Sequence, residues 1–244
     1  MNIHRFLLLA LSMIIFSCKG EKGTDNLVSH NKTGDIKGIV QLIDLEGKNS
    51  ATNSGVTITI DGDTLSAQTN NDGGWSIQGI NEGTRYLKFT KPGFATIEEY
   101  LVNVTAENEQ IIFCSMFQKP TYLIDSIYTD SSFSSTHLIL KGKIKDSLCN
   151  YSRRVLFFFN SQPNVSSTYP NWKYVSTGWI SKNSDTIFCV IGYSNLKINA
   201  SFTSGTKVYT ICYPDAFQTQ RAYYSGAEFT SLGTSSNVIS FIVP

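Results

Sequence analysis

The chain has 244 residues, a length that suits one or two domains. Charged residues make up 16% of it and the formal net charge is +1, so the overall field does not favour nucleic acid or a strongly acidic partner. The apolar fraction of 41% is ordinary for a protein with a packed core. We therefore expect folded domains and no nucleic-acid partner.

An apolar run from Phe6 to Ile15, interrupted only by Ser12, follows a weakly basic start. A run of this length is too short to span a bilayer as a stable helix but suits a signal peptide. A small residue then precedes Cys18, an arrangement that resembles the lipobox of bacterial lipoproteins. The resemblance implies that residues 1–17 are removed and that lipidated Cys18 anchors the chain to a membrane. An ordinary secretory peptide with an incidental cysteine is the alternative.

Residues 18–33 are mainly Lys, Gly, Glu, Asn, Ser and Thr, and little in them can be buried. This composition predicts a flexible tether between the lipid and the fold. Lys19 after Cys18 resembles the outer-membrane sorting choice of Gram-negative lipoproteins. The resemblance implies a cell-envelope protein on the outer membrane, facing either outward or into the periplasm.

Residues 34–118 are predicted to form a first domain of short strands. Val56, Ile58 and Ile60 alternate with threonines, as in a half-buried strand. The Asp61-Gly62 pair predicts a two-residue hairpin turn. The expected strands are residues 36–43, 55–61, 63–65, 95–104 and 110–113, with three glycine-separated runs inside 69–94 that give Trp75, Ile77, Tyr86 and Phe94 to the core. This succession of short strands favours a β-sandwich.

Three motifs in this domain carry a family resemblance: Gly38-x-Val40, Gly55-Val56-Thr57-Ile58 and Thr69-x-x-Asp72-Gly73-x-Trp75-x-Ile77-x-x-Ile80-x-x-Gly83-x-x-Tyr86-x-x-Phe89-x-Lys91-x-Gly93-Phe94. Together they resemble the carboxypeptidase regulatory-like domain, a transthyretin-like sandwich, over about residues 34–115. The resemblance implies an accessory domain without catalytic residues. Trp75 stands where Phe is usual, and Gly74 is an extra glycine.

Residues 119–244 are predicted to form a second sandwich. The expected strands are 122–127, 136–144, 154–159, 173–180, 186–191, 207–213 and 237–243. The motifs Phe159-Asn160-Ser161-Gln162-Pro163-Asn164, Phe202-x-x-Gly205-Thr206-x-Val208-x-Thr210-x-Cys212 and Asn237-Val238-Ile239-Ser240-Phe241 are similar to fibronectin type III-like domains of Bacteroidetes lipoproteins. Val208 stands where a core Tyr is usual, so either it or Tyr209 faces the core. The expected fold class is all-β, with two consecutive β-sandwich domains.

Aromatic residues are dense in turn-rich segments of the second domain, where exposed rings can stack on sugars or anchor a protein. The candidate ligand-binding residues are Tyr169, Trp172, Phe217, Arg221, Tyr223 and Tyr224. The alternative is that these aromatic side chains cover the open ends of a sandwich.

Cys189 and Cys212 are the first candidates for a disulfide, and buried free thiols are the alternative. No Cys-x-x-Cys pair is present, and acids near turns suit turn formation better than calcium binding, so we expect no metal and no cofactor. Four Asp-Ser/Thr-apolar triplets resemble an O-glycosylation acceptor of exported Bacteroidetes proteins. Their hydroxyl residues are Thr64, Ser126, Ser147 and Thr186.

The sequence contains no Gly-x-Ser-x-Gly elbow, no His-Glu-x-x-His and no phosphate-binding loop. We therefore expect no enzyme but a binding or adhesion protein of the cell envelope, with a glycan or a protein as ligand. The alternative is a structural spacer or subunit of an outer-membrane assembly. An enzyme of unrecognised type is the third hypothesis, and two acids converging in a cleft would support it.

Overall fold

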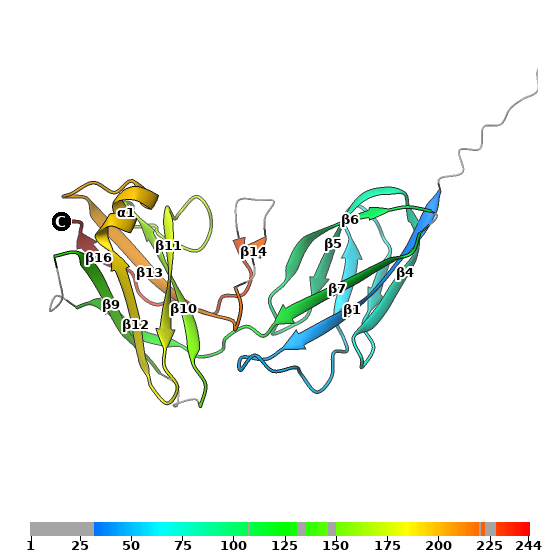
Figure 1. Ribbon diagram of the computed structural model, residues 1–244, viewed down its shortest axis with the longest axis horizontal. Coiled ribbons are helices and arrows are strands. Elements are labelled where there is room, and N and C mark those ends of the chain that lie inside the picture. Colours follow the sequence, from blue (N-terminus) through cyan, green and yellow to red (C-terminus); the bar gives the residue numbers. More distant parts are fainter. Residues whose placement is uncertain (1–31, 107, 131–134, 146–149, 220, 223–227) are drawn as a thin grey trace, which may run out of the picture. The chain divides into compact units, whose positions relative to one another are not determined.

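The computed structural model describes residues 32–244, apart from 107, 131–134, 146–149, 220 and 223–227. These residues are built of strands, together with one helix, α1 (Tyr193–Ala200). The strands form two β-sandwiches, one within residues 33–117 and the other within residues 124–242 (Figure 1). The predicted all-β class with two consecutive sandwiches is confirmed. In the described part of the chain no helix is long and apolar enough to cross a membrane.

The first domain has two facing sheets. Its strands are β1 (Thr33–Ile43), β2 (Thr57–Ile60), β3 (Ser66–Gln68), β4 (Gly74–Asn81), β5 (Gly83–Thr90), β6 (Ile97–Val104) and β7 (Gln110–Phe117). One sheet has the order β4-β1-β7 and the other the order β3-β2-β5-β6. β1 is antiparallel to β4 but parallel to β7, which reaches it from the far end of the domain sequence.

The core of the first domain lies between these sheets, where alternate residues of each strand are buried. Trp75 and Ile77 belong to it, and Phe94 packs against it half-buried, as predicted. Tyr86 was also expected in the core, and this prediction is wrong. Leu87 and Phe89 of β5 are fully buried instead, so Tyr86 falls on the other set of alternate positions.

The hairpin between β2 and β3 is confirmed, but its connection is longer than two residues. β2 ends at Ile60 and β3 begins at Ser66, so the five residues 61–65 connect the two strands. The Asp63 carboxylate accepts a hydrogen bond from the Leu65 N–H at 3.1 Å and so forms a turn of its own. The turn at Asp63 therefore lengthens the connection between β2 and β3.

The second domain is one curled sheet with the order β16-β13-β10-β11-β12-β9-β8. Its strands are β8 (Ile124–Thr129), β9 (His137–Ile144), β10 (Arg153–Asn160), β11 (Tyr174–Ile180), β12 (Thr186–Gly192), β13 (Lys207–Asp215) and β16 (Ile239–Ile242), and a separate hairpin joins β14 (Arg221–Ala222) to β15 (Glu228–Phe229). β11 and β12 share only two residue pairs, so the sheet folds over at this seam. Strands on both sides of the seam enclose one core.

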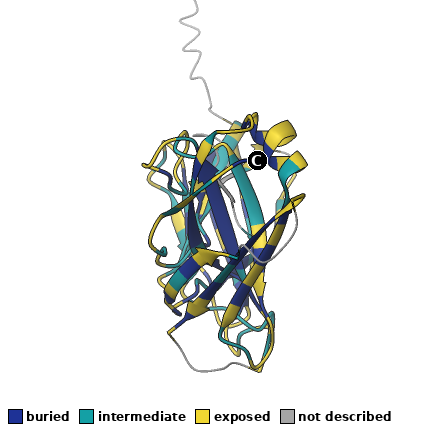
Figure 2. Cartoon of the chain, turned by 90° about the vertical axis from the view of Figure 1, so that its left-hand side faces the viewer, coloured by how far each residue is buried: buried dark blue, intermediate teal, exposed yellow. Residues whose placement is uncertain are grey.

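β10 is buried on both of its faces. Val155, Phe157 and Phe159 enter the enclosed core, whereas Leu156 and Phe158 face outward into a second cluster. Figure 2 shows the buried strands of this domain surrounded by exposed loops. On β13, Val208 is fully buried in the enclosed core and Tyr209 packs against the outer cluster, which settles the register of that strand.

The helix α1 was not expected from the sequence. Only Leu196 and Ala200 are buried on it, and they lie four residues apart on one face. Gly192 precedes the helix without a side-chain cap. So narrow an apolar stripe and an absent cap leave little helical signal in the sequence.

Candidate functional site

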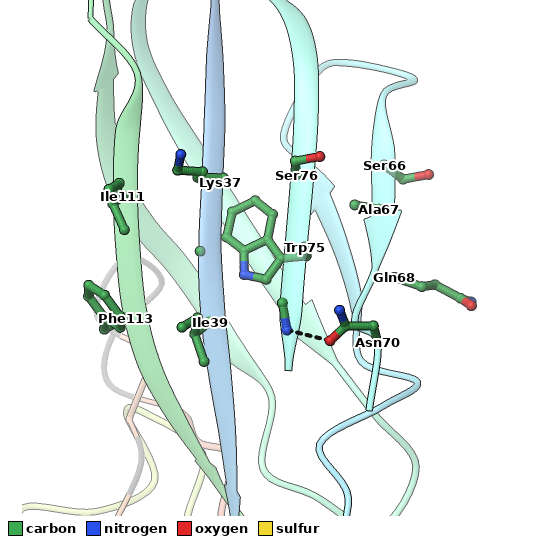
Figure 3. A pocket seen from close by; sticks show the side chains of 12 residues that line it. Lys37, Ile39, Ser66, Ala67, Gln68, Asn70, Trp75, Ser76, Ile111 and Phe113 are labelled. Carbon is green, nitrogen blue, oxygen red and sulfur yellow. Dashed lines mark hydrogen bonds between the residues drawn. The ribbon is translucent and has the colours of Figure 1, made fainter. Parts of the chain in front are cut away.

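A groove of about 840 Å³ crosses the outer face of the first domain's three-stranded sheet and continues to β3 (Figure 3). We call it the Phe113 groove. It is lined by Lys37, Gly38, Ile39, Ser66, Ala67, Gln68, Asn70, Gly74, Trp75, Ser76, Ile111 and Phe113. None of these side chains is His, Cys, Asp or Glu, and the ionisable side chain among them is that of Lys37, which is paired with Glu109.

One wall of the groove is apolar and open to solvent. Ile39, Ile111 and Phe113 are 45%, 57% and 68% exposed, respectively. Alternate residues of the same strands, such as Ile112, are buried, so these side chains must point outward. Parallel pairing places Phe113 directly beside Ile39. The wall is therefore a continuous apolar surface built from strands that are far apart in sequence.

The floor of the groove depends on Gly38. It pairs with Trp75 across β1 and β4, and a Cβ at Gly38 would lie 2.9 Å from the indole and 2.3 Å from the Ile112 carbonyl oxygen. Trp75 is only 6% exposed, and its ring packs edge-on against Phe89 at 5.7 Å. The indole therefore fills the core directly beneath the groove, and only glycine leaves room for it.

Gly74 has a different role from its neighbour Gly73. Gly73 has a φ of +85°, and its Cβ would lie 2.1 Å from the Val40 carbonyl oxygen, so the backbone requires glycine there. Gly74 lacks a positive φ, and its Cβ would meet only the Asn70 amide, at 3.2 Å. It pairs with Ile39 across the sheet. The missing side chain at Gly74 keeps the middle of the groove open.

The opposite wall carries amides and hydroxyls from Ser66, Gln68, Asn70 and Ser76. The Asn70 Oδ1 atom accepts a hydrogen bond from the Gly74 N–H at 2.8 Å (Figure 3) and another from the Asp72 N–H at 3.0 Å. These bonds fix the amide, so its Nδ2 donors are presented in one orientation. At the end of the groove Lys37 forms an ion pair with Glu109. The groove thus combines an exposed ring with fixed neutral donors.

The predicted ligand-binding residues of the second domain whose side chains are described differ in exposure and packing. Tyr169 is 56% exposed, but Trp172 is half-buried, with its ring packed against Phe158 and Phe229 at 6.2 and 5.9 Å. The expectation that Trp172 is an exposed stacking ring is therefore wrong, because it completes the outer cluster over β10. Tyr169 rests edge-on against Trp172 at 6.1 Å.

Phe217 is the other predicted contact whose side chain is described. Phe217 is 53% exposed and lines a hollow with Arg154 and Trp179. Arg221 belongs to β14, but its side chain lies outside the description, as do Tyr223 and Tyr224. The expected platform from these residues stays a prediction.

The disulfide prediction and the lipidation prediction for the cysteines have different outcomes. Cys189 and Cys212 are both buried in the enclosed core as free thiols, so the expected disulfide between them is wrong. The Cys189 thiol donates to the Thr177 carbonyl oxygen at 3.4 Å, which orients it within the core. Burial raises the pKa of Cys189 to about 11 and that of Cys114 to about 12, because the thiolate is poorly solvated. The lipidation candidate Cys18 lies outside the described residues.

The glycosylation candidates differ in accessibility. Thr64 and Thr186 are exposed, Ser126 is half-buried on β8, and Ser147 lies outside the description. Among the described residues no group of three His, Cys, Asp or Glu side chains is placed to hold a metal ion.

Sequence reasoning missed the Phe113 groove. Its apolar wall had a signal, since Ile111 and Phe113 alternate with buried residues of a predicted strand. The extra Gly74 was a second signal, because neither a turn nor a close backbone contact requires it. The parallel pairing of β1 with β7, which joins the two, leaves no local trace.

No protein-family model matches the chain, and no curated protein matches it. Among solved structures, the chain is similar to a type II cohesin–X-dockerin complex from Acetivibrio cellulolyticus, at 26% identity and a TM-score of 0.31. That match covers 35% of this chain and 58% of the other, so it spans little more than half of the other chain's length. A candidate carbohydrate-binding protein from Bacteroides uniformis is 13% identical over 85% of this chain and 98% of that chain, with a TM-score of 0.30.

The major pilin subunit of Bacillus cereus is 12% identical over 86% of this chain and 69% of that chain, with a TM-score of 0.34. Scores this low carry no argument about function. The proposal below therefore rests on the residues of this chain.

Proposed function

We propose that this protein is a non-catalytic binding protein of the bacterial cell envelope, and that its first domain holds a glycan in the Phe113 groove. The observation that carries the proposal is the exposed Phe113 ring opposite the fixed Asn70 amide. An aromatic face beside oriented hydrogen-bond donors suits a sugar, whose ring has an apolar face and a hydroxyl rim.

The distance between the two walls of the groove favours a ligand with more than one sugar unit. Phe113 lies on β7 and Gly74 on β4, with β1 between them, so two strand spacings separate these walls. At roughly 4.8 Å per spacing this is about 10 Å. A ligand that contacts both Phe113 and Asn70 must therefore be longer than a single ring.

The test is a glycan-array assay on residues 19–244, comparing the parent with Phe113→Ala and Gly74→Leu. The first variant removes the exposed ring, and the second fills the middle of the groove without a backbone clash. Phe188→Ala is the matched control, since Phe188 is a 47% exposed aromatic residue of the second domain. The proposal requires binding that both groove variants abolish and the control keeps. Binding that survives both groove variants would contradict it.

A structural role is the second candidate, and one observation favours it. β7 is the outermost strand of its sheet order, and Ile111 and Phe113 stand exposed beside that edge. Such an edge can pair with a strand of another envelope protein. Chemical cross-linking through a photoreactive residue at Ile111 in intact cells distinguishes the two. Capture of one protein, with no glycan bound on the array, would support the assembly role.

We further propose that the chain is an outer-membrane lipoprotein attached through Cys18. The support is the apolar run that ends at a small residue before this cysteine, followed by a polar tether. In the producing cell the parent should incorporate an alkyne-labelled fatty acid and partition into detergent. Cys18→Ala should do neither. Label retained by Cys18→Ala would refute the anchor.

The two domain types belong to the same proposal: carboxypeptidase regulatory-like for residues 34–118 and fibronectin type III-like for residues 119–244. The seven strands of each sandwich, in the predicted order along the chain, support it. O-glycosylation is proposed at exposed Thr64 and Thr186. Intact mass should fall by one glycan for each of Thr64→Ala and Thr186→Ala. An unchanged glycan mass would contradict modification at that residue.

A further inference from the structure

The apolar wall of the groove is a ridge with hollows on both sides. A second hollow, of about 520 Å³, shares Ile39 and Phe113 with the groove. Its other lining residues are Gln41, Asn53, Asp72, Cys114 and Ser115. The pairing of Gln41 with Ser115, two residues beyond the Ile39–Phe113 pair, shows that the second hollow continues along the same strands. A ligand stacked on Phe113 can therefore reach both hollows.

The charges around the ridge are not balanced. Lys37 in the groove is compensated by its ion pair with Glu109. Asp72, which lines the second hollow, is exposed, and no Lys, Arg or His among the described residues lies within salt-bridge distance of it. A carboxylate is negatively charged at neutral pH. Asp72 is therefore the uncompensated charge on the lining of the two hollows.

The position of Asp72 is fixed by the turn that also shapes the groove. Its N–H donates to the Asn70 Oδ1 atom at 3.0 Å, and the same oxygen accepts from Gly74. Asn53 lies beside this turn, since its N–H donates to the Asn71 carbonyl oxygen at 2.9 Å, and its Oδ1 atom accepts from the Leu42 N–H at 2.8 Å. Asp72 is thus held on an ordered turn whose hollow it shares with the neutral amides of Gln41 and Asn53.

We infer that the second hollow is a subsite for a sugar that carries an ammonium group, so that the ligand is an oligomer of amino sugars lying across Phe113. This inference rests on the proposed glycan function and specifies its ligand. The ammonium would lie against Asp72, while a neighbouring sugar ring stacks on Phe113 and the next reaches the Asn70 amide. N-acetylation would remove the charge and with it the preference.

The expected preference for an amino sugar with a free ammonium group over its N-acetylated form is modest, because Asp72 is exposed. Ion pairs at such positions contribute about 0.2–1 kcal/mol, which corresponds to roughly a 1.4- to 5-fold preference. The preference should shrink as salt is raised, since salt screens exposed charges. If the preference for an ammonium-bearing oligomer over its N-acetylated form did not respond to salt, the difference in shape and not in charge would explain it.

The test is calorimetric titration of residues 19–244 with a glucosamine tetramer and with its N-acetylated counterpart, at low and at high salt. The parent should bind the glucosamine tetramer about 1.4- to 5-fold more tightly at low salt. Asp72→Asn should bind both equally, while Asp61→Asn, an exposed aspartate on another turn, should behave as the parent. Equal binding of both oligomers by the parent, or an equal effect of both substitutions, would overturn the inference. If neither tetramer binds while neutral glycans do, the inference fails and the proposed function stands.

Discussion

The outer face of β1 and β7 in the first domain and the outer face of β10 in the second domain differ in whether other segments cover them. In the first domain Ile39, Ile111 and Phe113 project from the sheet and stay exposed. In the second domain the outward residues of β10 are buried, because Trp172 and Phe229 from later segments pack over them. The same alternation of side chains therefore gives an open surface on β1 and β7 and a second core over β10. An aromatic residue on an outward position becomes a binding residue only if nothing else in the chain covers it.

The largest effect should come from Phe158→Ala, which removes a ring from the covered face. Phe158 is fully buried, with ring centroids of Phe229 and Tyr213 at 4.8 and 5.4 Å. Truncation of such a ring should lower the free energy of unfolding by about 3–5 kcal/mol. Phe113→Ala on the open face should change it by less than about 0.5 kcal/mol. Urea unfolding of both variants measures the contrast, and similar losses would show that the two faces do not differ.

Substitutions of Gly38 and Gly74 should have different effects on the stability of the first domain. Gly38→Ala forces a Cβ against the Trp75 ring and the Ile112 carbonyl oxygen, so it should destabilise the domain by about 1–3 kcal/mol. Gly74→Ala meets only the Asn70 side chain and should leave stability within about 0.5 kcal/mol of the parent. Thermal unfolding followed by circular dichroism distinguishes them. A large loss for Gly74→Ala would mean that this glycine serves the fold, not the groove.

The enclosed core of the second domain predicts a pH dependence. Burial raises the folded-state pKa of the Cys189 thiol from an ordinary value near 9 to about 11, so the folded state keeps its proton longer than the unfolded state. This contribution to stability is complete below pH 9 and is lost as the pH rises toward 11. Over that range the parent should lose about 1–3 kcal/mol more than Cys189→Ala, at about 1.4 kcal/mol per pKa unit. Equal losses in urea titrations at pH 8 and pH 11 would contradict this prediction.

Many strands were predictable because their local sequence carries a strand signal. The predicted strand Thr136–Ile144 has Leu138, Leu140 and Ile144 on alternate positions, whereas β10 is a continuous apolar run that is buried on both faces. Elements with weak local signals were missed, including α1, whose buried face consists of Leu196 and Ala200. Tyr86 was misplaced because it stands next to the true core residue Leu87, and a shift of one residue exchanges the faces.

The candidate site was less predictable because it depends on contacts between distant segments. The aromatic density of the second domain suggested a platform there, but Trp172 fills the outer cluster. The groove needs β7 to lie parallel beside β1, which brings Phe113 to Ile39 across more than seventy residues of sequence. The glycine turn also obscured the role of Gly74, since the backbone requires glycine at Gly73 but not at Gly74.

The most direct test of the glycan groove is a chemical-shift titration of ¹⁵N-labelled residues 32–244 with the best glycan from the array. The account predicts saturable shifts in the amides of residues 66–76 and 111–115, which line the groove. It also predicts that Gly74→Leu abolishes those shifts while the rest of the spectrum is kept. Saturable shifts confined to the second domain, around Tyr169 and Phe217, would contradict the account and return the binding site to the region that the sequence first suggested.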